Sequence, residues 1–130
     1  MGHKPRVLIV EDNARNRKLF RLIVDNMGCE SLLASDGEEG LRQLEGALPD
    51  LILMDIQLPG IDGLTLLQQL REQPRTRTVP VVAVTSFAMP GDRERLLGAG
   101  FTDYLSKPID TEELQAVIAR LLPPGHGRDA

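Results

Sequence analysis

Residues 51–63 read LILMDIQLPGIDG, and this stretch decides the fold. Its first four residues are all apolar, which is typical of a strand buried on both faces of a parallel sheet. The strand ends at Asp55. Pro59-Gly60 and Asp62-Gly63 then predict a turn-rich loop, and Leu64–Leu70 has the apolar content of a helix. The stretch is therefore one β-α unit.

Four further strands are predicted, two before this unit and two after it. Each is a short apolar run, and longer segments with helical spacing lie between the runs. These strands are Val7–Val10, Glu30–Ala34, Pro80–Val84 and Tyr104-Leu105. Strands that alternate with helices assemble into a parallel sheet with helices on both faces. The sequence therefore predicts an α/β domain with five parallel strands.

The predicted helices have recognisable ends and apolar faces. Asp or Ser three residues before Glu forms a capping box, which satisfies free backbone donors at a helix start. The residues expected at helix starts are Asp36 and Glu39 for the second helix, Pro90 for the fourth, and Asp110 with Glu113 for the last. The residues expected where helices stop are Gly28 for the first helix, Gly98 and Gly100 for the fourth, and Pro123-Pro124 for the last. The expected core-facing residues are Leu19, Phe20, Ile23, Val24 and Met27, then Leu41 and Leu44, and finally Leu114, Val117, Ile118 and Leu121.

The chain has 130 residues, which is an ordinary length for one domain with one hydrophobic core. We expect an N-terminal tail at residues 1–5, a single folded unit at 6–122, and a C-terminal tail or truncated linker at 123–130. His3 and His126 fall in these tails, so neither is expected to be a ligand.

Charge and hydropathy exclude several classes of protein. A formal net charge of −4, without a run of Lys or Arg, disfavours binding to nucleic acid or to anionic lipid. No apolar stretch approaches the roughly 20 residues that span a bilayer. Cys29 is the single cysteine, so an internal disulfide is excluded and a buried apolar role in a reducing compartment is expected. The sequence predicts a cytoplasmic protein with no membrane partner and no direct nucleic-acid partner.

Chemically reactive side chains follow the predicted strands. In an open parallel sheet, ligands bind beyond the carboxyl ends of the strands, near the point where the strand order reverses. The residues at those ends are Glu11 and Asp12 after the first strand, Asp55 after the third, Thr85 and Ser86 after the fourth, and Lys107-Pro108 after the fifth. Three acids, two hydroxyls and one amine are therefore expected to converge.

Such a group of acids requires a cation. Unit charges about 4 Å apart repel by around 4 kcal/mol at an effective dielectric near 20. Oxygen ligands without histidine or cysteine suit a hard divalent ion, and Mg²⁺ fits best, with Mn²⁺ or Ca²⁺ as substitutes. A carboxylate attacks phosphorus to give an aspartyl phosphate, while a metal and an ammonium neutralise the transferring group. The predicted site has every part that this reaction needs.

At this point the chain resembles a known family, the receiver domains of response regulators in two-component signalling. It is similar to single-domain regulators of the chemotaxis and cell-polarity types, over about Arg6 to Leu122. The resemblance implies a flavodoxin-like, doubly wound (βα)5 fold with strand order 2-1-3-4-5. The stretches that carry it are Val7–Asn13, Leu53–Gly63, Val84–Ser86 and Tyr104–Pro108.

The resemblance also implies a role for each site residue. Asp55 is the phosphoacceptor, and the metal is held by Asp12, Asp55 and the backbone carbonyl of Gln57, with Glu11 acting through water. Thr85 and Ser86 supply hydroxyls near the phosphoryl group, and Lys107 binds the phosphate from a cis peptide with Pro108. Tyr104 is the aromatic residue that turns inward when the threonine moves.

Gln57 and Phe87 occupy the two positions that tune hydrolysis in this family. They lie two residues after the acceptor and two residues after the threonine. A bulky phenylalanine hinders an attacking water, so we expect a phosphorylated state that lasts minutes or longer.

The expected function is phosphoryl transfer from a histidine kinase or histidine phosphotransfer protein to Asp55, followed by a change of the protein-binding surface. The chain is then a signalling switch that catalyses only its own phosphorylation and slow dephosphorylation. The sequence is compatible with a complete single-domain regulator and with a receiver cut from a hybrid kinase or a DNA-binding regulator. The downstream target is not identified by the sequence.

Three other functions share parts of this pattern. A flavodoxin-like electron carrier needs a phosphate loop after the first strand, where Glu11-Asp12 repels phosphate. An aspartate-nucleophile phosphatase needs a general acid where this chain has Gln57. A receiver-like module that only binds proteins has no need for the acids, Thr85 and Lys107. All three are disfavoured.

Overall fold

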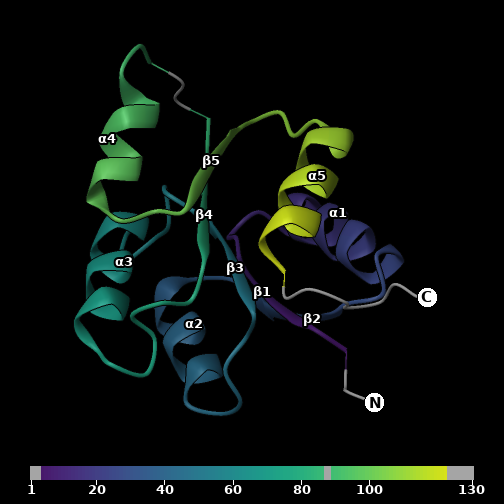
Figure 1. Ribbon diagram of the computed structural model, residues 1–130, viewed down its shortest axis with the longest axis horizontal. Helices are drawn as coiled ribbons and strands as arrows, with labels where there is room; N and C mark the ends of the chain where they lie inside the picture. The colour runs from purple at the N-terminus through teal and green to yellow at the C-terminus, as the bar shows by residue number, and fades with distance from the viewer. Residues whose placement is uncertain (1–3, 87–88, 123–130) are drawn as a thin grey trace.

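Five parallel strands form one sheet in the computed structural model, which describes residues 4–86 and 89–122. The strand order is β2-β1-β3-β4-β5, and every neighbouring pair is parallel. The predicted flavodoxin-like architecture is confirmed (Figure 1). The elements are β1 Arg6–Val10, α1 Ala14–Asn26, β2 Glu30–Ala34, α2 Gly37–Leu44, β3 Leu51–Asp55, α3 Gly63–Glu72, β4 Val81–Thr85, α4 Asp92–Ala99, β5 Asp103–Ser106 and α5 Thr111–Leu121.

The sheet separates two hydrophobic cores. Helices α1 and α5 cover one face, and α2, α3 and α4 cover the other (Figure 1). Because successive strand residues point to opposite faces, Val7 and Ile9 belong to the first core and Leu8 and Val10 to the second. All five residues of β3 are buried, as the apolar run at 51–54 predicts. The two cores fix the central strand and hence its last residue, Asp55.

The predicted capping residues Asp36 and Asp110 are the N-caps of α2 and α5, and one capping bond of α2 goes to a different residue than a capping box requires. The carboxylates of Asp36 and Asp110 accept hydrogen bonds from the backbone N–H groups of Glu39 and Glu113. The Glu39 carboxylate accepts from the N–H and the hydroxyl of Ser35, so this bond reaches one residue before the N-cap. These bonds hold the pKa of Glu39 below its ordinary value.

Three residues differ from their predicted positions. Pro90 lies before α4 and not in its first turn, because Gly91 is the N-cap with φ of 87° and the helix begins at Asp92. Gly98 lies in the last turn of this helix, which ends at Ala99, and the predicted stop at Gly100 is confirmed as its C-cap, with φ of 120°. Leu19 is 38% exposed, because the buried stripe of α1 is narrow and consists of Phe20, Ile23 and Val24.

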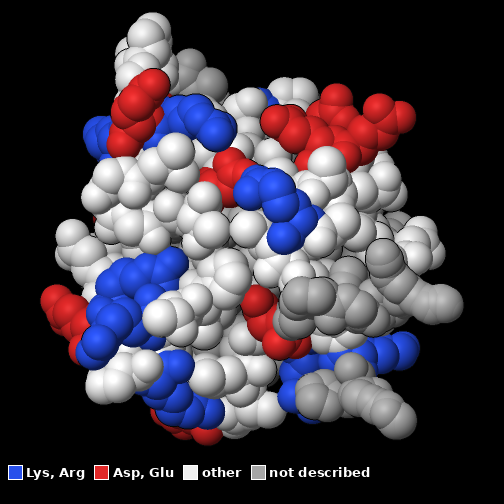
Figure 2. Space-filling model, in the orientation of Figure 1, with Lys and Arg blue, Asp and Glu red and all other residues white. Residues whose placement is uncertain are grey.

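Charges on the α4–β5–α5 side complement the local structure. Acidic side chains gather over the start of α5 (Figure 2). Glu112 and Glu113 follow the N-cap there, and their negative charges interact favourably with the positive end of the helix dipole. Asp103 at the start of β5 pairs with Arg93 of α4 and Arg120 of α5. These ion pairs join both helices to the edge strand.

The remaining sequence expectations concern single residues. Cys29 is buried in the core between the sheet and α1, and burial raises the pKa of its thiol. His3 and His126 lie outside the described residues. Within the described part of the chain, no helix has the length and apolarity that crossing a membrane requires.

Gly63 allows the start of α3 to lie directly against the end of β3. Its backbone N–H donates to the carbonyl of Ile56 at 3.0 Å. A Cβ atom at this position would lie 2.7 Å from the carbonyl oxygen of Asp55 and 2.8 Å from the Cα of Ile56. Both neighbours are backbone atoms, so a larger residue has to displace the strand end that carries Asp55.

We predict that Gly63→Ala destabilises the protein by about 1–3 kcal/mol, the usual range for overpacking. Gly98→Ala is the matched control, because a Cβ at this helical position meets no atom within 4 Å. It should stabilise α4 by about 0.5–1 kcal/mol. Urea unfolding measures both changes. Equal stability of the two variants would contradict the close approach at Gly63.

Candidate functional site

The site forms where the carboxyl ends of four strands meet. Glu11 follows β1, Asp55 ends β3, Thr85 ends β4 and Lys107 follows β5. In the sheet register, Asp55 is opposite Val84 on β4, and Thr85 is opposite Ser106 on β5. The parallel topology therefore brings together residues that are as far as 96 positions apart in the sequence.

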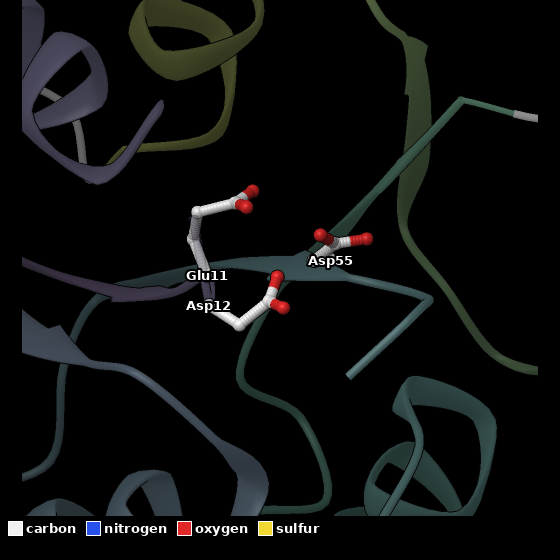
Figure 3. Close-up of side chains that lie close together, drawn as sticks. All are labelled: Glu11, Asp12 and Asp55. Atoms are coloured by element: carbon white, nitrogen blue, oxygen red, sulfur yellow. The ribbon is translucent and has the colours of Figure 1, made fainter. Parts of the chain in front are cut away.

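Glu11, Asp12 and Asp55 form a compact group of acids (Figure 3). One carboxylate oxygen from each residue lies within 4.8 Å of the others. Glu11 is 1% exposed and Asp55 is 3% exposed, whereas Asp12 is exposed to solvent. Two buried negative charges and one exposed negative charge thus share a small volume.

The ammonium group of Lys107 lies between the two buried acids. Its Nζ donates to Asp55 Oδ2 at 2.9 Å and lies 3.1 Å from Glu11 Oε1 and 3.4 Å from Glu11 Oε2. One positive charge against three carboxylates leaves two negative charges in excess. The cluster is therefore incompletely neutralised by the side chains that form it.

These charges change the pKa values of two groups. Burial raises the pKa of Glu11, and the charge of Asp55 raises it further. Burial alone would lower the pKa of Lys107, but its hydrogen bond to Asp55 and the charges of both acids raise it above its ordinary value. Lys107 is therefore fully charged at neutral pH, and Glu11 is the acid that holds its proton more tightly than usual.

Backbone donors orient the two buried carboxylates. The N–H of Gln57 donates to Asp55 Oδ1 at 2.9 Å, and the N–H of Asn13 donates to Glu11 Oε2 at 3.1 Å. Glu11 Oε1 is buried without a hydrogen-bond partner among the described residues, and its contact with Lys107 is an ion pair. A buried oxygen in this state is open to a cation or a water molecule.

The donor set fits a divalent metal ion. Three carboxylates supply oxygen ligands, which hard cations prefer, and a double positive charge equals the excess negative charge of the cluster. Glu11, Asp12 and Asp55 are thus the residues that could hold a metal.

The other expected site residues differ in burial. Thr85 is buried at the end of β4, while Ser86 and Gln57 are exposed. Tyr104 is half-buried and packs against the core beneath α2, α3 and α4. The peptide bond between Lys107 and Pro108 is cis, as expected. Phe87 lies outside the described residues.

Sequence reasoning missed one side chain at this site. The Nη1 atom of Arg17 donates to the backbone carbonyl of Glu11 at 2.8 Å and to that of Asp12 at 3.2 Å. The sequence contains one signal for this contact: a cation stands near the start of a helix, where the helix dipole favours acids.

Comparison with known proteins identifies the family of this chain. A sequence model of the response regulator receiver domain matches residues 7–119. The polar-differentiation response regulator DivK of Brucella anthropi is 48% identical over 116 residues, which cover 89% of this chain and 94% of that protein. The signal transduction histidine-protein kinase BarA of Shigella flexneri is 40% identical over 117 residues, which cover 90% of this chain and 13% of the kinase.

A solved structure with a bound metal is also similar. It is the receiver domain of a sensor histidine kinase from Pseudomonas aeruginosa PAO1, with a magnesium ion coordinated in its active site cleft. It superposes with a TM-score of 0.82 and 38% sequence identity, covering 91% of this chain and 97% of that one.

The raised pKa of Glu11 gives a prediction for the metal-free protein. A folded state that holds a proton more tightly than the unfolded chain gains stability at low pH, and this gain is lost as the pH rises above the ordinary value of 4.5 through the raised folded pKa. Glu11→Gln removes the buried charge, while Lys107 keeps its bond to Asp55. In chelator at pH 7, this variant should be more stable than the parent by on the order of 1 kcal/mol.

Urea unfolding at several pH values tests this prediction. The advantage of Glu11→Gln should disappear at about pH 4, where the parent carboxyl is also protonated. Added Mg²⁺ should stabilise the parent more than the variant, since the variant lacks one negative charge. A parent that is the more stable of the two in chelator at pH 7 would contradict the raised pKa.

Proposed function

This chain belongs to the response regulator receiver domain family, and we propose that Asp55 is the residue that its signalling partners phosphorylate. The proposal rests on one observation: Asp55 is a buried carboxylate at the end of the central strand, with Lys107 at 2.9 Å and two other acids within 4.8 Å. Receiver domains of two-component systems interact with histidine kinases or histidine phosphotransfer proteins. We propose a donor of this class for Asp55.

The reaction is transfer of a phosphoryl group to Asp55. A carboxylate oxygen of Asp55 forms a bond to phosphorus as the bond from phosphorus to the donor's histidine nitrogen breaks, and the histidine leaves with the electron pair. Gln57 holds the Asp55 carboxylate through its backbone N–H, so the nucleophile is oriented before the donor arrives. The proposed compartment for this transfer is the cytoplasm.

Mg²⁺ is the proposed metal, and when bound it would neutralise negative charge on the transferring group. Asp12, Asp55 and the carbonyl of Gln57 would hold it, and Glu11 would contribute through water. The exclusively oxygen donor set supports this assignment. Lys107 adds a fixed ammonium beside Asp55, which stabilises the phosphoryl oxygens during transfer.

Three further residues would convert phosphorylation into a changed surface. Thr85 lies at the end of the neighbouring strand, where its hydroxyl would donate to the phosphoryl group, and exposed Ser86 follows it. Tyr104 packs on the side of β5 that faces α4, so its ring would respond when Thr85 moves. Their positions support a switch that acts through β4, β5 and α4.

Both architectures that the sequence allows occur among the relatives. DivK matches this chain over nearly its whole length, whereas in BarA the match is a small part of a kinase. We propose the same phosphoacceptor chemistry for either context. A net charge of −4 supports protein partners over nucleic acid or membrane.

We predict that the protein gains the mass of one phosphoryl group when it is incubated with Mg²⁺ and acetyl phosphate. Asp55→Asn should gain none, because its amide is not a nucleophile, and a chelator should prevent the reaction of the parent. Intact mass spectrometry measures the product. Equal phosphorylation of Asp55→Asn, or none of the parent, would refute the proposed function.

Gln57 and Phe87 are proposed to slow the loss of phosphate. Gln57 is exposed beside Asp55, and the proposal for Phe87 rests on its position in the sequence. Phe87→Ala should shorten the lifetime of the phosphorylated protein by about tenfold, because an unobstructed water is better placed to attack phosphorus in line. Loss of phosphate is followed by mass spectrometry after the donor is removed. An unchanged lifetime would contradict the role of Phe87.

A further inference from the structure

The loop that carries Glu11 and Asp12 is held from several sides. The backbone N–H of Glu11 donates to the carbonyl of Ala34 on β2 at 2.9 Å, which extends the strand pairing by one residue. Its carboxylate is fixed by the N–H of Asn13 and by Lys107. After Asn13 the chain enters α1, for which Asn13 is the N-cap.

Arg17 completes this set of restraints from inside the helix. Its guanidinium reaches back over the N-terminus of α1, and one nitrogen donates to the carbonyls of both Glu11 and Asp12. The Asp12 side chain is exposed, so its packing does not fix the backbone at this residue. The hydrogen bond from Arg17 to the Asp12 carbonyl supplies that restraint. The Arg17 side chain lies in a groove with Leu22 and Leu33, and it is half-buried.

The position of Arg17 is unfavourable by the rules for an isolated helix. It lies in the first half of α1, which has no acid in its first turn, and its charge faces the positive end of the helix dipole. A residue that violates a local preference is expected where a site requires it. Two carbonyl bonds and the nearby excess of negative charge offset the unfavourable placement.

We propose that Arg17 is a positioning residue for the metal site: it holds the backbone of Glu11 and Asp12 so that both carboxylates face the cation. The proposal rests on the function proposed above, in which these acids hold Mg²⁺. Arg17 acts through the two carbonyl groups and does not touch the metal or the phosphoryl group. Without it, the acid loop has more conformations to lose when the ion binds.

The test compares Mg²⁺ affinity in variants that separate position from charge. Arg17→Met keeps a long apolar side chain in the groove but removes the donors, and it should weaken Mg²⁺ binding by about tenfold, the lower end of the range for groups that orient metal ligands. Arg17→Lys keeps the charge on a shorter side chain and should restore part of the affinity. Lys18→Met is the matched control, since it removes an exposed charge from the next residue of α1. Its affinity should stay within about twofold of the parent, because solvent and salt screen an exposed charge.

Isothermal titration calorimetry with MgCl₂ measures the affinities, and urea unfolding in chelator shows whether each variant is folded. Phosphorylation by acetyl phosphate at saturating Mg²⁺ should return Arg17→Met to the parental rate, because excess ion compensates for weak binding. A variant that loses stability but binds Mg²⁺ as the parent does would overturn the proposal and leave the proposed function intact. Equal losses in Arg17→Met and Lys18→Met would also overturn it, because charge alone would then explain both. A parent that binds no Mg²⁺ would overturn both proposals.

Discussion

The contact between Lys107 and two buried acids is the interaction on which the rest of the site depends. Burying Glu11 and Asp55 so close together is unfavourable, because each charge loses its hydration and repels the other. Lys107 offsets part of this energy from a distance of 2.9 Å to Asp55 and 3.1 Å to Glu11. It does so from the end of β5, so the charge balance is maintained only when the edge strand is paired with β4. Site electrostatics and sheet assembly are thus coupled.

The sheet makes this arrangement rigid by placing β3 at its centre. Each of its five residues is buried, and hydrophobic cores on both faces prevent the strand from sliding. A shift of one residue would exchange the two faces and turn Asp55 away from its partners. Gly63 brings α3 close behind the strand end, so the loop after Asp55 has little room to move. The Asp55 side chain is therefore oriented by the packing of the strand that carries it.

The elements that sequence predicts well are those with redundant signals. Each strand has an apolar run and a neighbouring helix, and the acids at 11, 12 and 55 follow strands whose ends must meet. The errors occur where one local signal competes with tertiary packing. Leu19 fits the helical spacing, but its side chain lies at the border of the buried stripe. Pro90 fits the first turn of a helix, but α4 starts two residues later, at Asp92. Arg17 escaped notice because its bonds go to backbone carbonyls, which no side-chain pattern specifies. The roles of Thr85, Tyr104 and Phe87 stay predictions.

The charge balance of the cluster explains why such a site is suited to switching. Three acids and one ammonium leave an excess of two negative charges, which a divalent cation neutralises. A phosphoryl group on Asp55 would carry about two negative charges at neutral pH. It would replace a carboxylate that carries one negative charge and accepts a bond from Lys107, so the cluster would gain about one negative charge. The ammonium would then have new acceptor oxygens farther from the strand end, and the proposed hydroxyl donors at the end of β4 would reach the same oxygens. Because the proposed donors lie at the ends of β4 and β5, which pair with each other, a charge added to Asp55 would act on both strands at once. A difference of a few kcal/mol between two arrangements of these strands is enough for that charge to reverse their populations.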